Sequence, residues 1–587
     1  MEYLVLITAL FLFVVAVFVR ETWIAGKERR NLIKTIAESY GHVCEREYTP
    51  ERFARIPGFY KRHRRETQLD DITWNDLDMD AVFRAINSSL SSIGEEYLYY
   101  RLRCTDLTQE EGDHLECVME YLDTHSEQRL ALQLFMNKLG YTGKYSLYEY
   151  LDQLDYLGER SNRLNILMLA LYPLCIALIP FSMGIGLAGL AMVMVFQILR
   201  YFKEKGEIEA YITSFVYVVR LINIAGEISR MDMPALEREQ EILRKNCSAL
   251  QKMKTGSYWV FSQNRANISS GNPLDVILDY LRMISHFDLM VFNHMLRQLN
   301  GHLKNVDALI ETVGYLETAI MVASYRKSLK EGYCVPQFSE CRETEEGCRK
   351  REPDKRKMIL ESAYHPLISK PVKNSITATR GVLLTGSNAS GKSTFLKTVA
   401  LNAILAQTIH TCCAKCYEAP LMRIYSSMAL RDDISGGESY YIVEIKALKR
   451  ILDAADQGDR PILCFVDEVL RGTNTVERIA AATQILKSFY SDKKSPILCF
   501  AATHDIELTQ LLEEYYDNYH FSEEIVEDDI RFNYLLKPGK ADSRNAIRLL
   551  GIMGYDEAII RRATQAAQIF LETGRWEVQP GNETKRN

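Results

Sequence analysis

Two stretches of this chain contain no charged residue, and their length predicts helices that enter a membrane. Residues 3–19 (YLVLITALFLFVVAVFV) have about the minimum length for one span. Residues 164–199 are too long for one span of a ~30 Å hydrocarbon core and just long enough for a two-helix hairpin that turns near Pro180. A secretory signal is the alternative for 3–19, but Glu2 stands where such signals carry Lys or Arg, and no small-residue cleavage site follows. We therefore expect an uncleaved anchor and about three spans.

Basic residues follow the first stretch and stand at both ends of the second. They are Arg20, Lys27, Arg29 and Arg30 after the first run, Arg160 and Arg163 before the second, and Arg200, Lys203 and Lys205 after it. Positive flanks face the cytoplasm, so residues 20–163 and 200–587 are predicted inside, with the hairpin dipping out and back. The basic run 60–65 is predicted either to touch anionic headgroups or to form a solvated loop.

The remaining pattern changes once along the chain. Residues 73–340 follow a helical period, with long regular segments at 275–300 and 305–330. Residues 380–545 alternate apolar strands with helices, which is typical of a parallel α/β sheet. The predicted fold class is therefore mixed: an α-helical core with transmembrane helices, followed by a C-terminal α/β domain.

The first chemical signal is a complete phosphate loop, GSNASGKST, at residues 386–394. It follows a short apolar strand, 381–385, and opens a helix, so backbone N–H groups and the positive end of the helix face one anion. Lys392 can reach the β- and γ-phosphates, and the Ser393 hydroxyl can ligate Mg²⁺. ATP and Mg²⁺ are the predicted ligands. The predicted nucleotide-binding residues of the loop are Gly386, Ser387, Asn388, Ala389, Ser390, Gly391, Lys392, Ser393 and Thr394.

Two further strands end in polar residues that suit hydrolysis. The apolar run 461–466 leads into Asp467 and Glu468, which can hold the Mg²⁺ shell and activate water, respectively. The run 496–503 leads into His504. A histidine in that position is often an ordinary surface residue, but beside the other motifs we interpret it as a γ-phosphate sensor.

A Ser-Gly-Gly-Glu element lies between these strands. Residues 432–439 (DDISGGES) precede an apolar helical pattern at 440–453. A serine at a helix start forms either a simple N-cap or an anion site.

Four segments together resemble the ATPase domain of the MutS family, an ABC-class P-loop NTPase. They are TGSNASGKSTFLKTVALNAILAQT, DDISGGESYYIVEIKAL, CFVDEVLRGTNTVERIAAA and ATHDIELT, in this order. The segment FNYLLKPGKADSRNAIRLLGIMGYDEAIIRRA is similar to the closing helical element that supports dimerisation in that family. The resemblance implies hydrolysis of ATP to ADP and phosphate in a homodimer.

The resemblance also implies a role for each matching position. Glu468 would activate water, His504 would act as the sensor, and Asp467 with Ser393 would hold Mg²⁺. His365, in a His-Pro-Leu segment, would lie near the adenine. The residues that would serve the partner's nucleotide are Ser435, Gly437 and Ser439, of which Ser439 fits the MutS register and Ser435 the general ABC register. This signature has Gly-Glu before Ser439, where the family usually has Gly-Arg.

The DNA-reading part of the family is not matched. Residues 73–104 and 303–338 resemble its helical core, but we find no N-terminal mismatch-reading domain and no Phe-x-Glu element, and 206–300 is short for a DNA clamp. The net charge of −6 provides no overall basic surface for phosphates. DNA therefore stays an open partner, whereas a membrane and a second copy are expected ones.

We expect seven regions. They are an anchor at 1–20, a juxtamembrane segment at 21–72, helical core at 73–163, a transmembrane hairpin at 164–199, helical core at 200–340, a charged linker at 341–358, and the ATPase domain with dimerisation helices at 359–587.

The resulting hypothesis is a membrane-anchored, MutS-like dimeric ATPase that uses ATP to drive conformational change. A mismatched-DNA-binding repair protein is the first alternative. An ABC-transporter-like subunit is the second, although the uncharged spans offer no polar substrate path.

Overall fold

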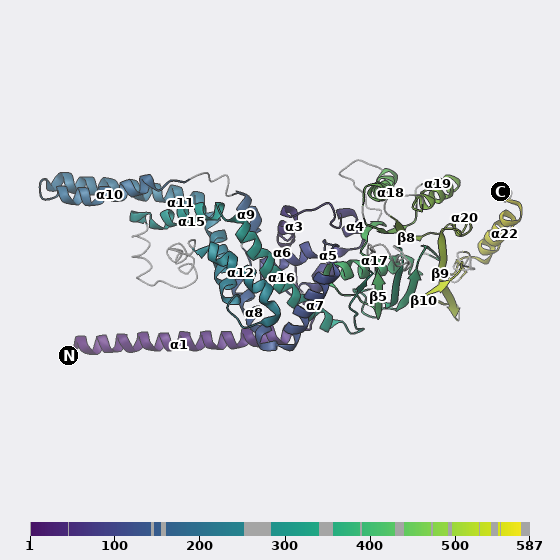
Figure 1. The fold of residues 1–587 in the computed structure, drawn as a ribbon, viewed down its shortest axis with the longest axis horizontal. Coiled ribbons are helices and arrows are strands. Elements are labelled where there is room, and N and C mark those ends of the chain that lie inside the picture. Colours follow the sequence, from purple (N-terminus) through teal and green to yellow (C-terminus); the bar gives the residue numbers. More distant parts are fainter. Residues whose placement is uncertain are drawn as a thin grey trace, which may run out of the picture. The chain divides into compact units, whose positions relative to one another are not determined.

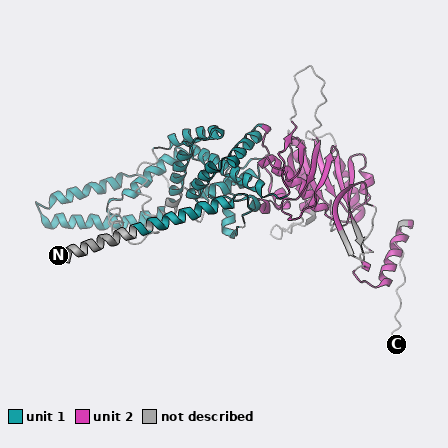
Figure 2. Cartoon of the chain, turned by 90° about the horizontal axis from the view of Figure 1, so that it is seen from below, with its two compact units in different colours: residues 1–66, 83–103, 110–330 teal, residues 67–82, 104–109, 331–587 magenta. Residues whose placement is uncertain are grey.

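A computed structural model describes most of the chain. The described residues are 2–44, 46–142, 146–153, 160–251, 283–339, 356–387, 390–428, 440–458, 460–470, 473–490, 496–526, 529–541, 547, 550–551 and 553–576. They form two compact units (Figure 2). Unit 1 comprises residues 1–66, 83–103 and 110–330, and unit 2 comprises 67–82, 104–109 and 331–587.

The described regular elements of unit 1 are all helices, as the sequence pattern predicts (Figure 1). Its helices are α1 (Glu2–Ser39), α2 (Pro50–Arg55), α3 (Gly58–Arg62), α6 (Ser92–Arg101), α7 (Gln109–Thr124), α8 (Ser126–Leu139), α9 (Leu147–Gln153), α10 (Arg163–Leu178), α11 (Met183–Ile228), η2 (Pro234–Leu236), α12 (Glu237–Ala249), α15 (Phe287–Asn300) and α16 (Leu303–Ser328), while α5 (Met79–Ile86) runs across the boundary with unit 2.

The core of unit 1 forms where α16 crosses α6. Gly314 of α16 allows this approach, because a Cβ there would stand 2.6 Å from Cβ of Tyr97 on α6. One turn further along α16, the buried Glu317 carboxylate accepts the N–H groups of Leu90 and Ser91, just ahead of α6. The Ser91 hydroxyl in turn caps α6 by accepting the N–H of Gly94 at 3.1 Å. Backbone groups at this helix start are thus satisfied from within the core.

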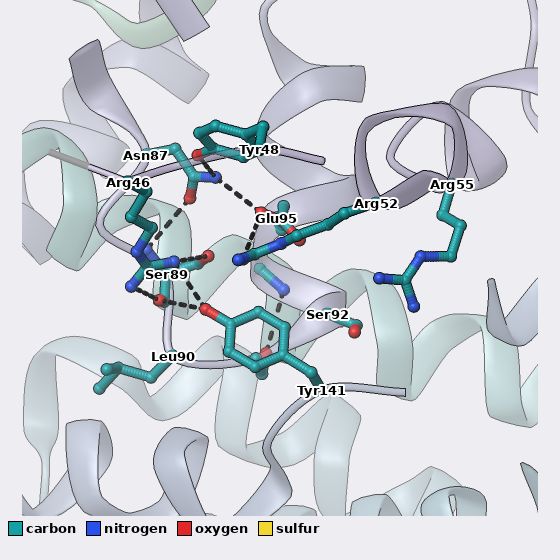
Figure 3. A network of polar contacts seen from close by, with 12 residues as sticks. Arg46, Tyr48, Arg52, Arg55, Asn87, Ser89, Leu90, Ser92, Glu95 and Tyr141 are labelled. Atoms are coloured by element: carbon teal, nitrogen blue, oxygen red, sulfur yellow. Dashed lines mark hydrogen bonds and ion pairs between the residues drawn. The ribbon is translucent and has the colours of Figure 1, made fainter. Parts of the chain in front are cut away.

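A second polar network joins the chain after α1 to the same helix pair (Figure 3). Arg52 donates to the Glu95 carboxylate at 2.9 Å, and Asn87 donates to Glu95 at 3.1 Å and to the Tyr48 hydroxyl at 2.8 Å. Because Glu95 and Asn87 are buried, these bonds form in a medium where charge-assisted contacts are strong. The network fixes the 46–59 segment onto unit 1.

The long helix α1 is held at its C-terminal end. The Tyr40 hydroxyl donates to Asp123 at 2.9 Å, and the Arg129 guanidinium lies 3.7 Å from the centre of the Tyr40 ring. Lys327 of α16 also binds Asp123 at 2.9 Å. The foot of α1 is therefore tied to α7, α8 and α16 of its own unit.

The predicted hairpin is present as α10 and α11. Helix α10 ends at Leu178 and α11 begins at Met183, so the turn falls at the expected Pro180 and Ser182. Among the described residues, one helical segment, Met183–Ile208 of α11, is long and apolar enough to cross a membrane, and only 11% of its most apolar window is buried. The hairpin itself is confirmed as secondary structure, while its relation to a membrane stays a prediction.

The described residues of unit 2 form two sheets. The first has the order β1-β5-β2-β3 and the second the order β10-β9-β4-β8-β7-β6. Strands β9, β4, β8, β7 and β6 run parallel to their neighbours, and β10 returns antiparallel to β9. The strands are β1 (Gln337–Phe338), β2 (Met358–Ala363), β3 (Asn374–Ala378), β4 (Gly381–Thr385), β5 (Cys416–Ala419), β6 (Arg423–Ser427), β7 (Ile462–Asp467), β8 (Ile497–Ala502), β9 (Tyr516–Val526) and β10 (Asp529–Pro538). The predicted parallel α/β domain is confirmed.

Helix α17 (Lys392–Ile409) is buried on nearly every side, because it contacts β2 of the first sheet and β7 and β8 of the second. The other helices of unit 2 are α4 (Asp71–Asp76), α18 (Tyr440–Gln457), α19 (Thr475–Ser488), α20 (Leu508–Leu511) and α22 (Glu557–Thr573). The three central strands of the large sheet, β4, β8 and β7, are almost entirely apolar, as burial on both faces requires.

Three stretches that were expected in the helical core, 73–82, 104–109 and 331–340, belong to unit 2. For the first of them, which lies within residues 67–82 of that unit, the reason is α4, whose buried Asp76 accepts the Ser426 hydroxyl at 2.6 Å and the Met428 N–H at 2.9 Å at the end of β6. These bonds join partners 350 and 352 residues apart along the chain, a distance that no local pattern reveals.

Candidate functional site

The phosphate loop begins where β4 ends, at the centre of the large sheet. Gly386 has φ +140° and Gly391 has φ +104°, values that favour glycine. A Cβ on Gly386 would stand 2.8 Å from the Phe521 carbonyl oxygen, so a side chain there would also collide with β9. Asn388 and Ala389 lie outside the described residues. The described part of the loop has the backbone that a phosphate cradle needs.

Lys392 opens α17 and turns back over the loop. Its side chain is 5% exposed, and its Nζ donates to the carbonyl oxygens of Gly386 and Ser387, each at 2.8 Å. Ser393 and Thr394 follow on the same helix, and the first backbone bond of the helix runs from Phe395 N–H to Gly391 O. The amides of residues 392–394 thus precede that bond and lie at the helix end that attracts anions.

Glu468 and His504 meet this lysine where three strands end, and Asp467 lies at the end of one of them. Asp467 is the last residue of β7, beside Ala502 at the end of β8, and Glu468 follows with its N–H bonded to the Ala502 carbonyl at 2.9 Å. His504 Nε2 lies 3.0 Å from Glu468 Oε1 and 3.3 Å from Lys392 Nζ. The parallel strands β4, β8 and β7 are adjacent, so their carboxyl ends bring these groups to one edge of the sheet.

The Nε2 atom of His504 has two neighbours, Lys392 and Glu468, and can form a hydrogen bond with only one of them at a time. Nε2 can accept a hydrogen bond from the Lys392 ammonium, or it can carry a proton and donate to the Glu468 carboxylate, but it cannot do both in one tautomer. Its contact therefore depends on where the lysine points, and a polyphosphate would draw the lysine away from the loop carbonyls. The arrangement places one imidazole nitrogen between the lysine ammonium and the carboxylate.

The backbone after β7 is strained where the acid is presented. Glu468 has φ +59° and Leu470 has φ +58°, the left-handed region that non-glycine residues rarely adopt. A hydrogen bond to α18 stabilises this backbone, because the buried Glu444 carboxylate accepts the Leu470 N–H. Glu444 is a supporting residue that the sequence did not point out.

A second residue pair missed by the sequence holds the histidine loop. Asp505, next to His504, accepts two hydrogen bonds from Arg478 of α19, at 2.9 and 2.6 Å. Hydrogen bonding to Asp505 raises the pKa of Arg478, so the guanidinium stays charged. Thr503 reinforces the turn by accepting the Asp505 N–H at 3.0 Å. The adjacency of Asp505 to the histidine was visible in the sequence, but the partner 27 residues earlier was not.

A cavity of about 340 Å³ lies next to the phosphate loop, within unit 2. Aromatic and aliphatic side chains form much of its wall, and Thr394 and Gly391 connect it to the loop. The lining residues are Ala363, His365, Ile368, Lys370, Pro371, Val372, Asn374, Gly391, Thr394, Phe395, Thr398, Phe521 and Tyr534. Its size and its apolar walls with a few polar groups fit a planar base whose phosphates lie on the loop.

His365 takes part in this cavity as a neutral ring. Burial, with a contribution from the nearby Lys397 ammonium, lowers the pKa of His365 to about 4. Tyr534 lies opposite the loop, with its ring 3.0 Å from where a Gly391 Cβ would stand, and Asn374 holds that strand by donating to the Tyr534 carbonyl at 3.0 Å. The sequence singled out His365 but neither Tyr534 nor Asn374.

The remaining predicted residues are not part of the described structure. Ser435, Gly437 and Ser439 fall within 429–439, outside the described residues. Helix α18 is described from Tyr440 and confirms the helical pattern predicted after this element. The roles of all site residues, described or not, stay predictions.

The comparison with family models finds the domain described as MutS domain V at residues 382–571. This range begins within β4 and includes the phosphate loop, the acidic pair and His504.

Curated proteins similar to the chain carry the same family name. The chain is 32% identical over 259 residues to the DNA mismatch repair protein MutS of Natronomonas pharaonis, covering 42% of this chain and 29% of that protein. It is 28% identical over 301 residues to the protein of that name from Fervidobacterium nodosum, covering 50% and 34%. It is 31% identical over 182 residues to DNA mismatch repair protein MutS 2 of Haloarcula marismortui, covering 31% and 19%. The matches thus span about a third or less of these relatives.

Proposed function

We propose that this chain, a member of the MutS family through its domain V, binds and hydrolyses ATP as a homodimer attached to a membrane. The observation that carries the proposal is the meeting of Lys392, His504 and Glu468 within 3.0–3.3 Å at the carboxyl ends of three adjacent strands. A structural ion pair alone would not require a glycine-built anion cradle beside it.

The donor set of the loop fits ATP with Mg²⁺. A buried ammonium that donates to two loop carbonyls, and a helix start that faces the same point, provide positive charge for a polyphosphate. Ser393 and Asp467 would hold the Mg²⁺, whose chemistry is to neutralise charge on the transferred phosphoryl group. The neutral His365 and the ring of Tyr534 would enclose the base in the adjacent cavity.

Residues of the chain then supply the steps around the phosphate. Lys392 would leave the carbonyls of Gly386 and Ser387 and bind the terminal phosphates. Glu468, fixed by its strained backbone, would orient a water and take its proton, and His504 would hold that carboxylate in place through Nε2. Ser435 or Ser439 of a second copy would complete the site, which is why we propose a homodimer.

Membrane attachment is proposed from the uncharged runs. The apolar side chains of α10 and of the first part of α11 are largely exposed, and basic residues flank both legs of the hairpin. The ATPase unit would lie on the cytoplasmic side, where ATP is.

Hydrolysis is tested by Glu468→Gln, with the exposed Glu477→Gln on α19 as the matched control. Phosphate release by the purified full-length chain in detergent should fall by roughly 10²–10⁴-fold in Glu468→Gln and stay unchanged in Glu477→Gln. Binding of a fluorescent ATP analogue should be retained in both. Undiminished release by Glu468→Gln would remove the residue from its role.

Binding of mismatched DNA is the second candidate, favoured by the names of the relatives. Fluorescence anisotropy with matched and mismatched duplexes, at two stated salt concentrations, decides between the two. A preference for the mismatch would make the chain a repair protein, whereas equal and salt-sensitive binding would indicate phosphate contacts only.

A further inference from the structure

The α10–α11 hairpin has two parts: an apolar shaft between residues 166 and 196, and a polar foot around Asn165, Gln197 and Tyr201. In its shaft the two helices pack closely, because Gly186 and Gly189 leave room for Ile179 and Cys175 of the other leg. The outward side chains are apolar and exposed, and Phe181 at the turn is 89% exposed. Large apolar side chains exposed on the shaft include Ile166, Leu167, Leu174, Ile176, Met183, Ile185, Met192 and Val195.

The foot of the hairpin is covered by protein. Asn165 of α10 and Gln197 of α11 are almost completely buried, and both bind His286, which precedes α15. His286 Nε2 lies 2.9 Å from the Gln197 carbonyl oxygen, and Nδ1 lies 3.4 Å from Asn165 Oδ1. One turn further from the tip, the Tyr201 hydroxyl donates to Asp288 at 2.8 Å. Basic residues also flank both legs beside this foot, and such residues lie at the level of the headgroups in membrane proteins.

The distance from this foot to the tip is shorter than a bilayer. From Asn165 to the end of α10 at Leu178, and from Gln197 back to the start of α11 at Met183, each leg rises about 20 Å at 1.5 Å per residue. The hydrocarbon core is ~30 Å thick. A hairpin whose foot lies at the headgroups of one leaflet therefore ends about 10 Å before the headgroups of the other leaflet.

The turn between α10 and α11 contains no charged residue. Pro180 has no N–H to satisfy, and the N–H groups of Phe181 and Ser182 both bind the Leu178 carbonyl oxygen, at 3.1 and 2.9 Å. Residues 173–199 contain no Trp, Tyr or charged side chain that would anchor the turn in an opposite headgroup layer. The two N–H groups that follow Pro180 are thus satisfied within the turn, and its side chains include no headgroup anchor.

We infer that the hairpin is a re-entrant wedge: it enters the bilayer from the side of the ATPase unit and turns within the hydrocarbon without crossing. The inference rests on the proposed membrane attachment and changes its topology, because the sequence alone had the hairpin dipping out and back. The occupant of the exposed apolar surface is the acyl-chain region of one leaflet and the start of the next. Such a wedge occupies area mainly in the leaflet it enters.

Ser182→Cys tests this in proteoliposomes of the full-length chain, with a membrane-impermeant maleimide added inside, outside or on both sides. Labelling is read by mass spectrometry of the peptide that carries residue 182. The exposed Ser161→Cys, just outside the foot, is the matched control, and the native Cys175 on α10 serves as a second probe of the shaft. ATPase activity of both variants should equal that of the parent, which confirms that they are folded.

We expect residue 161 to react from the ATPase side and residues 175 and 182 to react only after detergent is added. Reaction of residue 182 from the face opposite the ATPase unit would show a crossing hairpin, which overturns the wedge and leaves membrane attachment standing. Reaction of residue 182 from the ATPase side, or recovery of the chain in the soluble fraction without detergent, would overturn both.

Discussion

Glu96 of α6 should make the stability of unit 1 depend on pH. Its carboxylate is buried and accepts the Phe59 N–H and the Ser146 hydroxyl, both at 3.1 Å. Burial raises the pKa of Glu96 from 4.5 to about 8, and the two hydrogen bonds only partly oppose that rise. The carboxyl group is therefore neutral in the folded protein at pH 7 and ionised in the unfolded chain.

The sign of the effect follows from this difference. A raised folded-state pKa contributes stability that is fully present below pH 4.5 and is lost as the pH rises through about 8. A difference of about 3.5 between the two pKa values corresponds to roughly 5 kcal/mol over that window, or about 1.4 kcal/mol for each pH unit. Burial also raises the pKa of Glu317, to about 7. Both glutamates therefore lower the unfolding free energy of the parent protein as the pH rises.

The substitution Glu96→Gln isolates the contribution of Glu96. The amide oxygen can accept both hydrogen bonds of the carboxylate, and the side chain no longer titrates. Unfolding by urea, followed by far-UV circular dichroism at half-unit steps from pH 5 to 8, should show the variant gaining on the parent by about 1.4 kcal/mol per pH unit. Glu110→Gln on the exposed side of α7 controls for the loss of one carboxyl group. A difference between variant and parent that does not change with pH would refute the reasoning.

Three further predictions concern the site and the core. Lys392→Ala should weaken binding of a fluorescent ATP analogue by at least tenfold, because the buried ammonium is lost, and equal affinity would contradict its phosphate role. Arg478→Met should lower kcat with little change in KM, because Asp505 then no longer holds the histidine loop, and the exchange Arg478→Asp with Asp505→Arg should restore part of the rate. A rise in KM with kcat unchanged, or the absence of rescue, would make the pair merely structural. Gly314→Ala should cost about 1–3 kcal/mol of unfolding free energy, because its Cβ would stand 2.6 Å from Tyr97, and a thermal midpoint equal to that of the parent would contradict this packing.

The phosphate loop and the strands around it were predictable because their signals are local. The run 381–385 is one strand in the structure, the predicted helix begins at Lys392, and the apolar runs before Asp467 and His504 are β7 and β8. A glycine-rich turn between a strand and a helix is specified by a few adjacent residues, so spacing alone identifies it. The same holds for the hairpin, whose turn falls at Pro180 as expected.

The supporting residues were not predictable, because they act across long stretches of chain. Glu444 reaches Leu470 from another helix, and Arg478 reaches Asp505 from 27 residues away. Each of them is an ordinary charged residue in a helical pattern. Its role depends on which strand end it faces, and that is set by the sheet order.

The sequence by itself identified the groups on which the proposed chemistry rests: a phosphate loop, an acidic pair, a histidine, and two uncharged apolar stretches. Only the tertiary structure decided how these act together. It brought Lys392, Glu468 and His504 to one sheet edge, and it packed His286 against Asn165, 121 residues earlier, at the base of the hairpin. The physical reason is that composition and period report on contiguous residues, whereas proximity and burial depend on strand order and on helices that cross far along the chain.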